Sequence, residues 1–258
     1  MFRSVRIAFR LLVSGRSAEL KYVVRNRLKG LDLEFVSAEG LGLSPETSHY
    51  HSNSGGPSCA RVFRSLRIPP GSVALDLGSG KGGAVITLRE LPFEEIVGVE
   101  ISPELVSIAT DNVTRLRLRN IRFIQSDAAA FTDLDRFTHI YMYNPFPCGV
   151  VARVMDNVAA SLASADREIT LVYRNPLCDA EVRSSGLFER MRSMTVEEHE
   201  CVIYRYVPRS SVGGSDDTRR SHPDSSTPAR SPRATRGSKT DRSAPTAALT
   251  STPGRRPG

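Results

Sequence analysis

Residues 73–84, which read VALDLGSGKGGA, constrain the fold of this chain more than any other stretch. The first of them suit a buried strand that ends in an acid, Asp76. Glycine then alternates at positions 78, 80 and 82, and small and apolar residues suited to a helix follow. Glycine tolerates backbone angles that other residues avoid, and it lets a ligand approach the main chain closely. A strand, a glycine turn and a helix N-terminus together indicate an α/β sheet that holds a nucleotide-like ligand at its carboxyl edge.

The residues after this turn alternate between strand-like and helix-like runs. Strands are predicted over residues 96–100, 121–125, 139–142 and 169–173, and helices over 83–91, 103–119 and 150–162. Two further β-like runs, 191–196 and 201–207, are separated by only four residues, too few for a crossover helix, so they should pair antiparallel. The sequence therefore predicts an α/β, Rossmann-like, seven-stranded and mostly parallel sheet with an antiparallel C-terminal hairpin.

Composition divides the chain into four segments. Residues 1–44 are predicted to be a basic helical N-terminal extension, in which apolar residues recur at helical spacing between arginines. Residues 45–70 are predicted to be a lead-in loop and a short helix, residues 71–208 the α/β domain, and residues 209–258 a disordered Ser/Pro/Arg-rich tail. The first residues also resemble a transit peptide or a membrane-surface helix, and the lead-in loop is either a connector or a flap over the ligand.

The net charge of +7 comes from the two ends of the chain. Residues 1–30 carry +7 and residues 209–258 carry +6, whereas the residues between them carry −6. Basic ends of this kind are either solvated segments or sites of non-specific attraction to nucleic acid or acidic membrane. No apolar run approaches the roughly 20 residues that span a bilayer, so no integral membrane segment is expected.

The four cysteines, Cys59, Cys148, Cys178 and Cys201, are scattered and form no C-x-x-C pair. This usage predicts ordinary thiols in a reducing compartment, and hence a cytoplasmic protein, rather than a disulfide frame. His49 and His51 have no third ligand near them in sequence, so no metal site is expected.

Several nucleotide-binding patterns compete for the glycine turn. A phosphate-binding P-loop needs Ser or Thr after its Gly-Lys pair, and here Lys81 is followed by Gly82, which excludes that pattern. A dinucleotide fingerprint G-x-G-x-x-G does match positions 78, 80 and 83, with Glu100 near the place of a ribose-binding acid. That fingerprint alone is weak, and it requires neither an acid before the first glycine nor a terminal hairpin.

A third pattern fits more positions. An acid ends the first strand, a second acid ends the next strand at Glu100, and a third follows the third strand at Asp127. With the turn Asp76-x-Gly78-x-Gly80-x-Gly82, these acids resemble the class I S-adenosylmethionine (SAM)-dependent methyltransferases over residues 72–207. Residues 75–82, 97–105 and 141–146 also resemble a group of small bacterial methyltransferase-domain proteins, and the first two stretches resemble, more distantly, the non-SET histone-lysine methyltransferases.

The resemblance implies S-adenosyl-L-methionine as cofactor and a role for each acid. Asp76 and the glycine turn would hold the methionine part, Glu100 the ribose hydroxyls, and Asp127 the adenine amine. Carboxylates accept well from a ribose diol, and a cationic sulfonium needs no basic cradle. The implied cofactor-binding residues are Asp76, Gly78, Ser79, Gly80, Gly82, Glu100, Ile101, Asp127 and Ala128.

Residues 144–147 follow the fourth strand, where the methyl group should point. They resemble the Asn/Asp-Pro-Pro-Tyr/Phe motif of methyltransferases that act on planar nitrogens, which implies catalytic roles for Asn144, Pro145 and Phe146. Only one proline precedes the aromatic here, so the backbone can follow a different path and the loop can instead simply close the pocket. No residue stands out as a general base, which suits an amine acceptor without excluding oxygen.

The functional hypothesis is therefore a SAM-dependent methyltransferase with an unknown acceptor, expected to be a nitrogen of a protein or nucleic acid. Two alternatives stay open: a small-molecule O-methyltransferase, and a domain that binds SAM or a related nucleotide without catalysing transfer.

Overall fold

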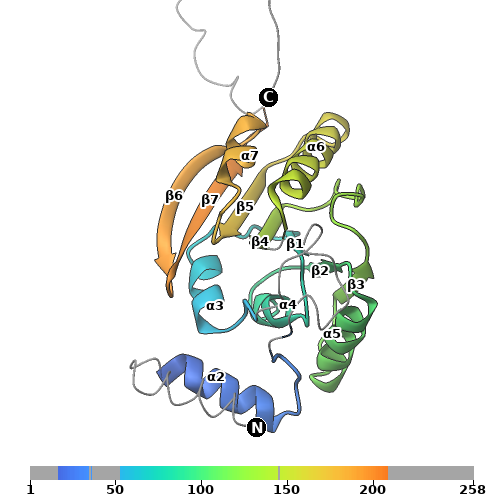
Figure 1. Cartoon of the computed structure of the whole chain (residues 1–258), viewed down its shortest axis with the longest axis vertical. Helices are drawn as coiled ribbons and strands as arrows, with labels where there is room; N and C mark the ends of the chain where they lie inside the picture. Colours follow the sequence, from blue (N-terminus) through green and yellow to red (C-terminus); the bar gives the residue numbers. More distant parts are fainter. Residues whose placement is uncertain (1–16, 35, 37–52, 145, 209–258) are drawn as a thin grey trace, which may run out of the picture. The chain divides into compact units, whose positions relative to one another are not determined.

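The computed structural model describes residues 17–34, 36, 53–144 and 146–208. Its centre is a seven-stranded sheet (Figure 1). Predictions that concern the other residues, including the first sixteen, the tail after residue 208, and Pro145, lie outside the described residues. The strands are β1 (Val73–Leu77), β2 (Glu95–Glu100), β3 (Ile121–Gln125), β4 (His139–Tyr143), β5 (Ile169–Arg174), β6 (Glu189–Val196) and β7 (His199–Tyr206).

The strand order is β3-β2-β1-β4-β5-β7-β6. The first five strands pair parallel to one another, and β7 pairs antiparallel with both β5 and β6. This confirms the predicted mostly parallel sheet with a C-terminal hairpin. Strands β2 and β3 lie on one side of β1, and β4 and β5 lie on the other side. The strand order therefore reverses between β1 and β4, and sheets of this kind bind ligands at the carboxyl ends of the two strands that flank such a switch point.

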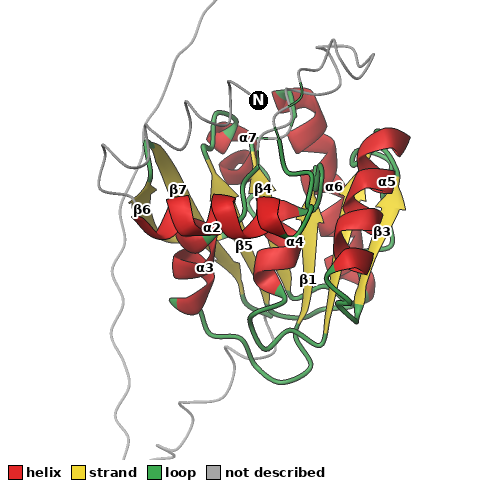
Figure 2. Cartoon of the chain, turned by 90° about the horizontal axis from the view of Figure 1, so that it is seen from below, coloured by secondary structure: helices red, strands yellow, loops and turns green. Residues whose placement is uncertain are grey.

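Helices cover both faces of the sheet (Figure 2). One face packs on the side chains of α3 and α4, and the other on α6 and α7, which gives two separate apolar clusters. Because the central strands are buried on both faces, they consist of nearly continuous apolar residues. The described helices are α2 (Ser17–Leu28), α3 (Pro57–Arg64), α4 (Gly83–Leu88), α5 (Pro103–Arg115), α6 (Cys148–Ser164) and α7 (Asp179–Ser184). No helix among the described residues is long and apolar enough to cross a membrane.

Two helices differ from the sequence prediction. Helix α5 ends at Arg115 rather than near residue 119, because Arg117 and Asn120 adopt positive φ angles of 53° and 59° and turn the chain into β3. The short helix α7 was not predicted, since only Val182 among its six residues is buried and it carries no long apolar stripe.

The prediction that all four cysteines are free thiols is wrong for two of them. Cys148 and Cys178 form a disulfide with a Cα–Cα distance of 5.2 Å, while Cys59 and Cys201 are free and buried. The two bonded cysteines are 30 residues apart in sequence. They meet because β4 and β5 are parallel neighbours and each cysteine follows the carboxyl end of one of these strands.

Candidate functional site

The glycine turn between β1 and α4 lies directly beside the end of β2. Gly78, Gly80 and Gly82 all have positive φ angles, of 78°, 52° and 80°. The backbone N–H groups of Gly78 and Ser79 both donate to the carbonyl of Val99, at 2.9 and 3.0 Å, which fastens the turn to β2. The hydroxyl of Ser79 is buried and has no hydrogen-bond partner among the described residues, so a polar group remains available on this turn.

Asp76 lies on β1 and is only 2% exposed. Its burial, together with the nearby carboxylate of Glu100, raises the pKa of its carboxyl group from 3.8 to about 8. Desolvation penalises the charged form, and a second negative charge adds to that penalty. A cationic ligand bound beside Asp76 would favour the ionised carboxylate, because the positive charge offsets the free-energy cost of ionising a buried acid.

Glu100 joins the end of β2 to the glycine turn. Its two carboxylate oxygens accept from the backbone N–H of Gly80 at 2.9 Å and from that of Ser102 at 3.0 Å. Burial raises the pKa of Glu100, and these backbone donors oppose the rise. Each oxygen retains a further lone pair, so the carboxylate has capacity for the two hydroxyls of a ribose.

Asp127 stands just beyond β3, at the same edge of the sheet. Its side chain is exposed, and one of its oxygens accepts from the backbone N–H of Ala129 at 2.9 Å. The neighbouring Ala128 is buried, and Ile101, after β2, is half-buried. The three acids thus lie at or just beyond the carboxyl ends of three adjacent strands, β1, β2 and β3.

The lead-in segment passes across the first turn of α4. The backbone N–H of Gly56 donates to the hydroxyl of Thr87 at 2.7 Å, and a Cβ on Gly55 would lie only 2.1 Å from the carbonyl oxygen of Gly83. A side chain at position 55 would therefore push the segment away from the glycine turn. This part of the lead-in segment therefore lies beside the glycine turn, whereas residues 45–52 lie outside the described residues.

The side chain of Lys81, in the middle of the turn, bonds within the protein and is not positioned as a phosphate-binding lysine. Its ammonium group is buried and bonds to a carboxylate oxygen of Asp32 at 2.6 Å. Asn112 of α5 joins the same two residues, because its side-chain amide donates to the backbone carbonyls of both Asp32 and Lys81. The structure thus agrees with the exclusion of a P-loop.

Asn144 follows β4 with a φ of 38°, and its backbone N–H donates to the carbonyl of Arg174 at 3.1 Å. Its side-chain oxygen is shielded from solvent and has no hydrogen-bond partner among the described residues. Phe146 is 7% exposed and packs in the apolar cluster under α6, so its ring is largely core. The motif therefore contains an amide oxygen without a partner among the described residues and a ring that is largely buried in the core.

The sequence reasoning missed a buried arginine whose backbone carbonyl bonds to Asn144. Arg174, at the end of β5, is 2% exposed, pairs with the carboxylate of Glu197 at 2.5 Å and lies over the ring of Tyr143 at 4.4 Å. Burial disfavours its charge, but the neighbouring Tyr141, Glu197 and Tyr143 outweigh this and raise the pKa of Arg174. The signal that could have found it is a lone arginine that ends an otherwise apolar strand.

An open hollow of about 810 Å³ lies elsewhere, between the end of α6, the start of β6 and the end of β7. It is at the opposite edge of the sheet from the acids and is therefore separate from the site described above.

Residues 68–207 match the family model described as a methyltransferase domain, which is more than half of the 258-residue chain. The chain belongs to this methyltransferase family. It is an enzyme that uses S-adenosyl-L-methionine, and the alternative of a non-catalytic nucleotide-binding domain is not supported. The residues present fit this cofactor: two buried carboxylates and an unpaired hydroxyl meet at a close-lying backbone turn.

Curated relatives match the methyltransferase over short stretches. Release factor glutamine methyltransferase from Vibrio cholerae is 40% identical over 52 residues, which is 20% of this chain and 18% of that protein. Arsenite methyltransferase from Halobacterium salinarum is 28% identical over 91 residues, 34% of this chain and 23% of that protein. The chain thus matches less than a quarter of the length of either relative.

Solved structures align over a larger part of the methyltransferase. A SAM-dependent methyltransferase from Aquifex aeolicus aligns with 58% of this chain and 89% of its own, at 16% identity and a TM-score of 0.47. An RNA methyltransferase from Salinibacter ruber, solved with S-adenosyl-L-homocysteine, aligns with 59% and 92%, at 22% identity and a TM-score of 0.45. Structures this distant do not identify the methyl acceptor of this chain.

Proposed function

We propose that this methyltransferase transfers a methyl group to a nitrogen atom of a protein or nucleic-acid acceptor. The observation that carries the proposal is the side-chain oxygen of Asn144, buried and without a partner among the described residues at the carboxyl end of β4. A buried unpaired oxygen costs about 1–3 kcal/mol, and an N–H of the acceptor would remove that cost.

The cofactor supplies a methyl group on a positively charged sulfur, with a neutral leaving group. The task of the chain is to hold the acceptor nitrogen at about 3 Å from that carbon in line with the breaking bond. In the proposal, Asp76 and the glycine turn hold the amino-acid part of the cofactor, Glu100 its ribose and Asp127 its adenine. Asn144 accepts the N–H of the acceptor, which orients the nitrogen lone pair.

The other two motif residues have supporting roles in this proposal. Phe146 packs in the core and supports the loop that carries Asn144, with only a small part of its ring open to an acceptor. Pro145 lies outside the described residues, and its role is proposed from the motif alone.

A macromolecular acceptor is supported by the basic ends of the chain and by the name of one relative. Residues 1–30 and 209–258 carry net charges of +7 and +6, which suits an acidic partner such as nucleic acid. The relative from Vibrio cholerae is a release factor glutamine methyltransferase, a name that indicates a protein acceptor. A cytoplasmic location, where both kinds of acceptor are found, is part of the same proposal.

The experiment is a transfer assay with SAM labelled on its methyl group, the full chain and fractionated cell lysate. Label in protein or nucleic acid, found on nitrogen when the labelled amino acid or base is identified by mass spectrometry after hydrolysis, is the expected result. Label confined to small molecules and carried on oxygen would instead favour the O-methyltransferase. Asn144→Ala should reduce transfer at least about a hundredfold while S-adenosylhomocysteine still binds, because orientation is lost and the cofactor site is intact.

Asn120→Ala is the matched control for that variant. Asn120 also has a positive φ, of 59°, but it precedes β3 at the opposite edge of the sheet. Both substitutions place alanine in a left-handed backbone, which costs about 1 kcal/mol. Equal losses of activity in the two variants would mean that backbone strain, rather than the amide oxygen of Asn144, explains the effect.

A further inference from the structure

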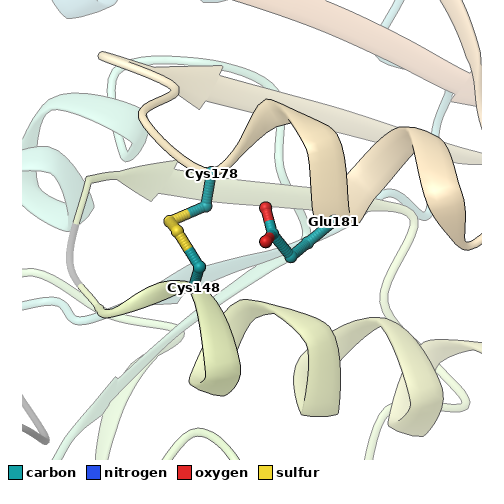
Figure 3. Close-up of side chains that lie close together, drawn as sticks. All are labelled: Cys148, Cys178 and Glu181. Atoms are coloured by element: carbon teal, nitrogen blue, oxygen red, sulfur yellow. A yellow bond between two sulfur atoms is a disulfide. The ribbon is translucent and has the colours of Figure 1, made fainter.

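Three groups of the kinds that ligate metals, two cysteines and a carboxylate, meet at the carboxyl edge, apart from the cofactor residues. Cys148 is the first residue of α6, Cys178 directly precedes α7, and Glu181 lies on the first turn of α7. Their sulfur and carboxylate oxygen atoms all lie within 4.8 Å of one another. Figure 3 shows the carboxylate beside the two bonded sulfurs.

Glu181 is incompletely satisfied in this arrangement. One of its carboxylate oxygens, Oε2, is shielded from solvent and has no hydrogen-bond partner among the described residues. By contrast, the nearby Asp179 bonds to both Tyr204 and Arg183. A buried carboxylate oxygen without a donor costs free energy, and either a cation or a donor at this point would recover it.

The chemistry of the three groups selects the kind of cation. Cys148 begins the 17-residue helix α6, and a helix N-terminus favours the thiolate over the thiol. Two thiolates and a carboxylate suit Zn²⁺, which takes sulfur and oxygen ligands at four-coordinate sites and can complete its shell with water. Mg²⁺ and Ca²⁺ prefer oxygen alone and are disfavoured by the sulfurs.

We propose that Cys148, Cys178 and Glu181 form a redox-gated Zn²⁺ site. The disulfide is the form that does not bind Zn²⁺, because two sulfurs bonded to each other cannot act as thiolate ligands. A dithiol reductant opens it: the S–S bond takes up two electrons and two protons, and the reductant is itself oxidised to a disulfide. When Zn²⁺ binds, the two thiols release their protons to solvent and both sulfurs coordinate the metal.

The test titrates Co²⁺, a spectroscopic substitute for Zn²⁺, into the full chain reduced by a phosphine that contains no sulfur. Absorption from sulfur-to-cobalt charge transfer should appear, saturate at one equivalent and disappear when Zn²⁺ displaces Co²⁺. The oxidised chain should show none of it. Absence of the band from the reduced chain, or its presence at equal strength in the oxidised chain, would overturn the proposal.

Matched variants assign the ligands. Cys148→Ala/Cys178→Ala should lose the band, and Cys59→Ala/Cys201→Ala should keep it, because that second pair is buried on the other face of the sheet. Glu181→Gln should weaken Co²⁺ binding at least about tenfold, as removal of groups that support a metal site does. An unchanged band in the first variant, or unchanged affinity in the third, contradicts the assignment.

Binding of S-adenosylhomocysteine reports whether each variant is folded, because the cofactor residues are left intact. A second measurement needs no variant at all. Zn²⁺ should protect Cys148 and Cys178 of the reduced wild-type chain from alkylation by iodoacetamide, as mapped by peptide mass. Equal alkylation of both residues with and without Zn²⁺ would count against the site.

Discussion

The carboxyl group of Asp76 links cofactor binding to pH. Its pKa lies at about 8, so below that pH the acid has to lose a proton before it can pair with the ammonium group of the cofactor. The affinity for S-adenosylhomocysteine should therefore rise with pH, by up to about tenfold per unit, and level off above about pH 8. Calorimetric titrations in buffers of different ionisation enthalpy should also show uptake of one proton by the buffer per ligand bound. An affinity that stays constant from about pH 6 to about pH 9 would contradict this role.

Asp76→Asn separates the stability of the methyltransferase from its function. Because the folded-state pKa of Asp76 is raised from 3.8 to about 8, this acid favours the folded state most at low pH, and that contribution is lost as pH rises through about 8. The amide does not titrate, so the variant should melt at a higher temperature than the wild type at neutral pH. Thermal melts across the pH range should show a flatter profile, while binding of S-adenosylhomocysteine is lost. A lower melting temperature at neutral pH would show that Asp76 is not a buried acid whose raised pKa costs stability at that pH.

The third glycine of the turn is required by both conformation and space. Gly82 has a φ of 80°, and a Cβ there would lie 2.8 Å from Cζ of Phe123. Gly82→Ala should destabilise the fold by about 1–3 kcal/mol from backbone strain and overpacking, and weaken cofactor binding with it. Gly149→Ala is the control: it lies in α6 with nothing within 4 Å of an added Cβ, so alanine should stabilise that helix by up to about 1 kcal/mol. Urea denaturation of both variants measures the difference, and equal effects would refute the steric argument.

At the scale of elements, the parts with a buried periodic pattern could be predicted and the parts fixed by tertiary contact could not. All seven strands were expected, because apolar runs bounded by turn residues are strong signals, and their observed ends differ by at most two residues. Helix α7 buries only Val182, and the cysteine pair meets only through the pairing of β4 with β5, so neither leaves a local pattern. Arg174 and its partner Glu197 come together for a similar reason, because Arg174 pairs with Cys201 of β7 and Glu197 lies in the turn just before β7.

Asn112 of α5 fixes the segment that follows α2. It is 2% exposed, its amide N–H groups bond to the carbonyls of Asp32 and Lys81, and its oxygen accepts from the backbone N–H of Asp32. Asn112→Ala should lower the free energy of unfolding by about 1–3 kcal/mol, because buried backbone groups lose their partners. Hydrogen exchange should accelerate at residues 31–34 of the variant.

Asn157 of α6 offers a comparison, since its side-chain amide bonds to the carbonyls of Ala129 and Phe131 in the same manner. Asn157→Ala should speed exchange around residues 129–131 and leave residues 31–34 as in the wild type. Faster exchange of residues 31–34 in both variants would indicate general destabilisation rather than local anchoring.

For the molecule as a whole, charge and chemistry are carried by different parts of the chain. The family match covers residues 68–207 and the last strand ends at Tyr206, whereas residues 209–258 carry ten Lys or Arg and four Asp. The central residues 31–208 carry a net charge of −6, which would repel nucleic acid. If the acceptor is nucleic acid, the basic ends therefore have to supply the attraction.

Removal of residues 209–258 tests that division. The affinity for S-adenosylhomocysteine should stay the same, because every proposed cofactor residue lies before residue 129. The affinity for nucleic acid should fall, and its dependence on salt should become shallower, since fewer phosphate counterions are released. A full-length chain with the tail's Lys and Arg residues replaced by Gln is the matched control, and it should behave like the deletion because charge rather than length is responsible. Binding and salt dependence that survive both changes would exclude the tail from acceptor recognition and leave residues 1–30, with their net charge of +7, to supply the attraction.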